Sequence, residues 1–171
     1  MVYVVNGQKR VMFFKKKVPV SEYCNWTLLT VFSQEQEATW DTFRATSADP
    51  ALSKIDRKAY FDNLRALFLQ VMLIAVTKNS FKTSFDALAY TSQWLKHEGK
   101  TEIAVLCDEY NAAFGTPGQD GIVRMVRYFS FTLTGSAMRK DTEQLLVAEF
   151  YEIMRAFYKE FESIRLVAIK Q

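Results

Sequence analysis

The segment over residues 56–77 constrains the fold more than any other part of the chain. Its second half, residues 64–76, is apolar on nearly every face of a helix, with Arg65 and Gln70 as the main polar interruptions. Its interior consists mostly of good helix formers. Because a helix that is apolar all round is a buried helix, the segment predicts a central core helix that amphipathic helices cover.

Local signals bound this helix at both ends. Ser53 followed by Asp56 resembles a capping box, and Lys78 with Asn79 supplies a cation and a residue that tolerates a left-handed cap. The mostly unbroken apolar run is about 13 residues long, short of the roughly 18 that indicate a membrane-spanning helix. We therefore expect a core helix and no membrane span.

Composition favours an all-helical chain. The 171 residues include only 3 prolines and 6 glycines, and 49% are hydrophobic. Long periodic runs with few chain breakers are typical of helices, and this length fits one domain. The sequence predicts an all-α fold, a bundle of about six helices around residues 56–77. We expect a single helical domain over residues 21–171.

Apolar periodicity and capping residues place the other helices. Ser33, Asp120 and Asp141 are the predicted amino-terminal caps of three of them, and Gly99 is a predicted carboxyl-terminal glycine. The helix over 84–98 is expected to turn Phe85, Leu88, Ala89, Trp94 and Leu95 inward. The predicted ranges are 21–32, 33–46, 84–98, 101–115, 122–134 and 141–169.

Residues 1–20 differ from the rest of the chain. Two β-rich runs, 2–5 and 11–14, flank Asn6 and Gly7, and Asn-Gly is the strongest short-range hairpin signal. A lone hairpin is only marginally stable in water, so it must pack on the helices or pair with another chain. We predict an N-terminal β-hairpin or extended arm over residues 1–20, the first candidate for an assembly element.

The helix predicted over 141–169 has an apolar face too wide for one neighbouring helix. Either it is wedged between two helices, or it contributes to an interface between copies of the chain. Aromatic residues and methionine are enriched at such interfaces, and the alternative is ordinary bundle core. The candidate interface residues are Tyr151, Met154, Phe157, Tyr158 and Phe161.

The charge balance permits nucleic acid as a partner without requiring it. The formal net charge is +3, from 22 basic and 19 acidic residues. Phosphates need dispersed cations, and bases stack on exposed aromatic rings. The alternative is that these cations are simply solvated helix faces and tips. The candidate nucleic-acid-binding residues are Lys9, Arg10, Lys15, Lys16, Lys17, Arg124, Arg127, Tyr128, Arg139 and Lys140.

Residues typical of catalysis are scarce. The single histidine, His97, stands at a predicted helix end and is best explained as a helix-end cation. Glu149 and Glu152 have a spacing that a magnesium site can use, but solvated carboxylates are the better interpretation. No zinc, nucleotide-binding or nucleophile motif occurs in the sequence. We therefore expect a protein that is not an enzyme and has no cofactor and no metal.

The two cysteines, Cys24 and Cys107, stand far apart among apolar residues and are predicted to be buried free thiols. This favours an intracellular setting, cytoplasmic or nuclear. The leading hypothesis is a non-enzymatic interaction or assembly protein that forms a homo-oligomer. The alternative is a nucleic-acid-binding protein that coats RNA or DNA through the backbone. The expected partner is thus another protein, a second copy included, or a single-stranded nucleic acid.

Overall fold

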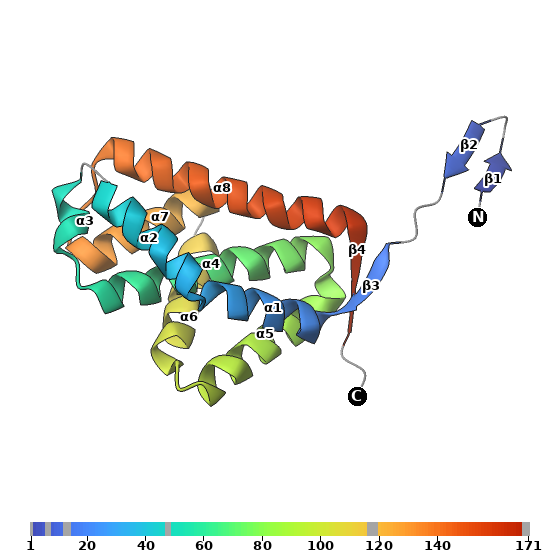
Figure 1. Ribbon diagram of the computed structural model, residues 1–171, viewed down its shortest axis with the longest axis horizontal. Coiled ribbons are helices and arrows are strands. Elements are labelled where there is room, and N and C mark those ends of the chain that lie inside the picture. The colour runs from blue at the N-terminus through green and yellow to red at the C-terminus, as the bar shows by residue number, and fades with distance from the viewer. Residues whose placement is uncertain (1, 6–7, 12–14, 47–48, 116–119, 169–171) are drawn as a thin grey trace.

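The computed structural model describes residues 2–5, 8–11, 15–46, 49–115 and 120–168. Over these residues the chain forms a helical bundle with two small two-stranded sheets (Figure 1). This confirms the predicted all-α bundle. The helices are α1 (Val20–Val31), α2 (Gln34–Thr46), α3 (Pro50–Lys54), α4 (Arg57–Asn79), α5 (Phe81–His97), α6 (Thr101–Gly115), α7 (Gly121–Thr134) and α8 (Lys140–Ser163). The strands are β1 (Val2–Val5), β2 (Gln8–Val11), β3 (Lys16–Pro19) and β4 (Ile164–Val167).

Helix α4 is the predicted central helix, and it packs against α1, α5, α6, α7 and α8. Leu67 and Met72 on this helix are completely buried. The Asp56 carboxylate caps it by accepting a 2.9 Å hydrogen bond from the Ala59 amide. Asp56 therefore takes the role predicted for Ser53, because the residues before it form the short helix α3, which the sequence did not predict.

The polar residues of α4 find partners inside the protein. Arg65 forms ion pairs with Asp62, at 3.1 Å, and with Glu37, and Gln70 Nε2 donates to Asn111 Oδ1 at 2.9 Å. By length and composition alone α4 is long and apolar enough to cross a membrane, yet 83% of its most apolar 18-residue window is buried in the bundle. This burial is what a core helix requires.

Most of the predicted helix ends are confirmed within a residue or two. Ser33 Oγ accepts from the Gln36 amide at 3.2 Å at the start of α2. Asp120 Oδ1 accepts from the Ile122 amide at 2.9 Å at the start of α7. Asp141, however, is not the cap of α8, because that helix already begins at Lys140 and Asp141 lies in its first turn.

The carboxyl-terminal segment corrects the prediction of a helix continuing to residue 169. Helix α8 ends at Ser163, and β4 follows and pairs in parallel with β3. Val18 lies opposite Leu166, which is buried. Branched side chains in β4 suit a strand, and the ladder to β3 replaces the hydrogen bonds that a longer helix would make. Segments from opposite ends of the sequence thus meet beside the end of α8 (Figure 1).

The predicted N-terminal hairpin is confirmed as an antiparallel pair of β1 and β2, with Val2 opposite Val11. Its second strand is Gln8–Val11 and not residues 11–14 as predicted; the turn residues 6–7 and residues 12–14 lie outside the described residues. Figure 1 draws the hairpin apart from the helices. Lys16–Pro19, assigned to the arm by the sequence, belongs to β3 and is joined to the helical body through β4.

Helix α5 confirms the inward face predicted near its end but not the one predicted near its start: Leu95 is buried and Trp94 packs against the core, whereas Phe85, Leu88 and Ala89 point outward. Its buried residues are Thr83, Ala87, Thr91 and Leu95, each four positions from the next. These mostly small side chains let α5 lie close to α1 and α4. Phe85 and Leu88, both predicted to be core residues, are 66% and 48% exposed, and Ala89 is also exposed.

Candidate functional site

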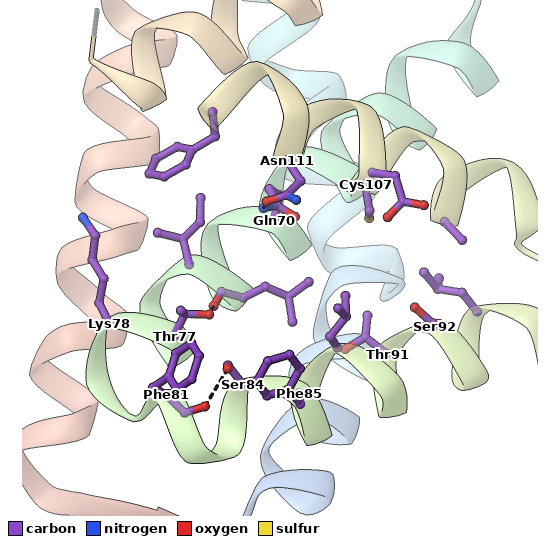
Figure 2. Close-up of a pocket in the computed structure, with 17 residues that line it drawn as sticks. Gln70, Thr77, Lys78, Phe81, Ser84, Phe85, Thr91, Ser92, Cys107 and Asn111 are labelled. Carbon is purple, nitrogen blue, oxygen red and sulfur yellow. Dashed lines mark hydrogen bonds between the residues drawn. The ribbon is translucent and has the colours of Figure 1, made fainter. Parts of the chain in front are cut away.

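The exposed face of α5 borders an apolar cleft between α4, α5 and α6, which we name the α5 groove. Its volume is about 460 Å³. Figure 2 shows Phe81 and Phe85 on successive turns of α5, below the polar pair Gln70 and Asn111. The large apolar side chains that line the groove are Leu73, Ile74, Phe81, Phe85, Leu88 and Phe114.

Two phenylalanines form the open edge of the α5 groove. The rings of Phe81 and Phe85 meet edge to face with their centroids 5.5 Å apart, and the two side chains are 68% and 66% exposed. Ser84, between them, donates from Oγ to the carbonyl oxygen of Phe81 at 2.7 Å (Figure 2). Large apolar side chains that gather at a cleft and remain in contact with water mark a binding surface.

Several polar groups of the α5 groove are engaged in hydrogen bonds within the chain. Gln70 Nε2 donates to Asn111 Oδ1, and the buried Cys107 thiol lies 3.7 Å from the carbonyl oxygen of Ala66. Burial raises the pKa of Cys107 to about 12, so this thiol stays protonated and unreactive at neutral pH. The groove therefore offers apolar contact, and its chemistry is that of binding.

The predicted interface residues on α8 lie mainly inside the chain. Met154, Phe157 and Phe161 are buried. The Phe157 ring packs on Phe68 of α4 with centroids 5.7 Å apart, and the Phe161 ring lies 5.4 Å from Tyr23 of α1. The wide face is thus wedged among other helices, and ordinary core packing accounts for its apolar character.

The two remaining predicted interface residues, Tyr151 and Tyr158, are half-buried on α8. Tyr151 hydrogen-bonds to the carboxylate of Asp120, which raises the pKa of Tyr151 to about 12. Tyr158 packs its ring against the core. A role for either residue in contacts between copies of the chain stays a prediction.

The predicted basic residues near α7 make bonds within the chain. Arg124 donates from Nε to the carbonyl oxygen of Ala113 at 2.9 Å and so closes the end of α6. Arg127 pairs with Glu143 at 2.9 Å, and the Tyr128 hydroxyl donates to a Glu109 oxygen at the same distance. These side chains thus have structural roles that do not require a nucleic acid.

The remaining predicted cations fall into separate places. Arg139, which pairs with Asp141, and Lys140 stand at the start of α8. The exposed Lys15, Lys16 and Lys17 stand near its other end. Helix α8 has 24 residues, which corresponds to about 36 Å, so these two basic groups do not form one surface. Lys9 and Arg10 lie on β2.

The residues singled out for catalysis are solvated. His97 Nδ1 lies 3.0 Å from a Glu98 carboxylate oxygen at the exposed end of α5. Glu152 pairs with Arg155, and Glu149 is exposed. In the part of the chain that the structure describes, no three His, Cys, Asp or Glu side chains gather to hold a metal ion.

Sequence reasoning missed Phe81 of the groove and two further cations, Lys82 and Arg165, which lie near Lys15. The signal for Phe81 was present, because Phe81, Phe85 and Leu88 follow helical spacing on a second face of α5. Arg165 was hidden within the expected helix over 141–169. No protein-family model, no curated protein and no solved structure matches the chain.

Proposed function

We propose that this chain is a non-enzymatic assembly protein whose α5 groove receives a second copy of the same chain. The exposure of Phe81, Phe85 and Leu88 around an apolar cleft carries this proposal. Contiguous exposed apolar patches on soluble proteins are commonly interaction sites, and aromatic side chains are enriched in the buried centres of interfaces.

The N-terminal hairpin of the second copy is the segment that we assign to the groove. β1 and β2 pair with each other, and no other described strand joins their sheet. Such a hairpin needs further packing to be stable, and its sequence is rich in apolar residues at 2–5 and 11–14. Exchange of identical elements between copies is a low-cost route to assembly, and this chain carries both an apolar arm and an uncovered groove.

The expected energy is sufficient for measurable association. Full burial of a phenylalanine or leucine side chain stabilises a contact by about 1.5 to 3 kcal/mol. A change of 1.4 kcal/mol is a tenfold change in affinity. Replacing Phe85 with serine is therefore expected to weaken self-association about tenfold or more.

The test is the mass of the protein in solution, measured by sedimentation velocity over a range of concentrations. Phe85→Ser and a deletion of residues 1–14 should both shift the protein towards monomer. Phe131→Ser is the matched control, because Phe131 is 57% exposed on α7 and does not line the groove. The deletion stops before Lys15, since Lys15 Nζ donates to the Phe161 carbonyl oxygen and Lys16 begins β3.

A wild-type protein that stays monomeric throughout would overturn the proposal, as would assembly that is unchanged in Phe85→Ser. If Phe85→Ser dissociates the assembly and the deletion does not, the groove receives another part of the second copy and the arm has no role. Loss of assembly in Phe131→Ser to the same extent would mean that general surface hydrophobicity drives association.

A further inference from the structure

A second cleft lies beside β4, where that strand faces the junction between α4 and α5; we name it the β4 cleft. Its volume is about 480 Å³. Three of its lining residues, Lys15, Lys82 and Arg165, are cationic, and none is acidic. These residues come from three separate parts of the sequence and lie together only in the folded chain, so no single segment of the sequence reveals this positively charged site.

The pairing of β3 with β4 adds a fourth cation to this surface. Lys17 lies directly opposite Arg165 in the parallel ladder. Because Val18 and Leu166, the next pair, face the core, the alternation of a strand points Lys17 and Arg165 outward together. Like charges directly opposite each other destabilise a strand pair, and a bound anion would relieve that repulsion.

No carboxylate within the described residues neutralises these side chains. Lys17, Lys82 and Arg165 form no ion pair there. Lys15 is fixed by its 2.6 Å hydrogen bond to the carbonyl oxygen of Phe161, which leaves further N–H donors of its ammonium group available. Within the described residues the cleft thus holds one anchored cation, Lys15, and two without an ion pair, Lys82 and Arg165, and Lys17 lies beside them on β3.

The start of α5 contributes to the same cleft. Ser80, the N-cap residue, lines the cleft, and its side chain makes no capping hydrogen bond. The amino-terminal end of a helix carries partial positive charge, here at a helix of 17 residues. Because the longer helix α4 ends at Asn79 beside the same cleft, the partial negative charge of its carboxyl-terminal end offsets this contribution, and the attraction for an anion comes from the lysine and arginine side chains.

We propose that the β4 cleft, together with the outward face of β3 and β4, binds successive phosphate groups of a single-stranded nucleic acid. The cations are spread along a cleft and an adjoining strand pair, and dispersed cations suit a phosphate backbone. A flexible single strand can bend so that its phosphates reach both the cleft and the adjoining strand pair, whereas bending a stiff duplex over so short a distance costs energy. Recognition is through phosphates, since charge is what these residues share, and it is therefore independent of base sequence.

The experiment measures binding of a fluorescently labelled oligouridylate by anisotropy at a series of salt concentrations. The wild type should bind, with affinity that falls as salt rises. Lys82→Gln with Arg165→Gln should bind more weakly. Its salt dependence should be flatter by about 1.4 in the slope of log K against log salt, since each single-strand phosphate contact contributes about 0.7.

Two double variants remove the same charge elsewhere. The first, Lys96→Gln with Lys100→Gln, removes two positive charges near the turn between α5 and α6. The second, Arg139→Gln with Lys140→Gln, removes two at the start of α8. All six substituted side chains are exposed, so each variant is expected to keep the fold, which circular dichroism checks. Both controls should bind like the wild type.

Failure of the wild type to bind the oligonucleotide at low salt overturns the proposal. So does an equal loss in the Lys96 and Lys100 variant, which would reflect net charge alone, or a loss confined to the Arg139 and Lys140 variant. Binding to phosphatidylserine vesicles without binding to oligouridylate would assign the cleft to a lipid surface instead. The Lys82 and Arg165 variant should keep the wild-type sedimentation behaviour, which separates this site from the α5 groove.

Discussion

The Tyr110 hydroxyl donates a 2.8 Å hydrogen bond to Oδ1 of Asn63 and so ties α6 to the central helix α4. Both side chains are buried, and Asn63 Nδ2 donates in turn to the carbonyl oxygen of Ala59 at 2.9 Å. The Asn63 amide therefore has both its acceptor and its donor engaged. In an interior of low dielectric, a polar group without a partner costs more than the hydrogen bond itself contributes.

Replacing Tyr110 with phenylalanine keeps the ring and removes the donor to Asn63. We expect a loss of about 1 to 3 kcal/mol in the free energy of unfolding, measured by urea denaturation. Tyr158→Phe is the matched control, because Tyr158 is half-buried and makes no hydrogen bond within the described residues. Equal losses in the two variants would show that the bond to Asn63 contributes nothing specific.

The Asp120 carboxylate begins α7 by accepting hydrogen bonds from the amides of Ile122 and Val123, at 2.9 and 3.4 Å. Asp120→Ala is expected to lower the free energy of unfolding by about 0.5 to 2 kcal/mol at pH 7. Asp120→Asn keeps a side-chain acceptor and should lose less, since asparagine is also a good cap. Comparing the two variants by urea denaturation separates the contribution of the capping hydrogen bonds from that of the carboxylate charge.

The charge of Asp120 predicts a further dependence on pH. A hydrogen bond from Tyr151 holds the pKa of Asp120 below its ordinary value of 3.8. Because the folded pKa is the lower one, the stabilisation is present above the unfolded pKa and is lost as pH falls through the folded value. The gap in unfolding free energy between wild type and Asp120→Asn should therefore shrink below about pH 4; a gap that is independent of pH would contradict this assignment.

Leu166 distinguishes the observed strand β4 from the helix that the sequence predicted. In the strand it is buried, whereas the helical stripe would have turned Ile164 and Ala168 inward. Leu166→Ala should cost about 2 to 5 kcal/mol in urea denaturation. The control Leu145→Ala, on α8 at 58% exposure, should stay within about 0.5 kcal/mol of wild type. A neutral Leu166→Ala would contradict the β3–β4 pairing.

The elements that local sequence predicts are those whose causes lie within a few residues or within one helix. Helix α4 was predictable because a helix that is apolar on all sides is stable only when it is buried. Asp120 and Gly99 were predictable because a cap acts within a few residues. β4 was not, since Ile164 continues the helical stripe of α8, and the strand that pairs with it lies near the other end of the sequence.

The candidate sites were harder to predict than the helices. On α5, the small side chains Thr83 and Ala87 face the core because they allow close helix packing, while Phe81 and Phe85 remain outside. Hydrophobicity alone favours the opposite arrangement. Arg124 was predicted to bind phosphates, yet it bonds to carbonyl oxygens at the end of α6, a role that depends on how two helices meet.

The buried cysteines make a prediction for alkaline pH. Burial raises the pKa of Cys24 to about 11 and that of Cys107 to about 12, from an ordinary value of 9.0. The folded chain therefore keeps both thiol protons to a higher pH than the unfolded chain does. Their stabilisation is fully present below about pH 9 and is lost as the pH rises towards the folded values.

The free energy of unfolding, measured by urea denaturation, should thus not change with pH on account of these thiols up to about pH 9, and should fall above it by up to about 1.4 kcal/mol per pH unit for each cysteine. The hydroxyl of Tyr60, whose pKa is also raised by burial, steepens the fall above about pH 10. Cys107→Ala lowers stability at neutral pH through the lost packing, and its decline above pH 9 should be shallower. A decline as steep as that of the wild type would mean that Cys107 does not titrate on unfolding and that other groups cause the alkaline loss.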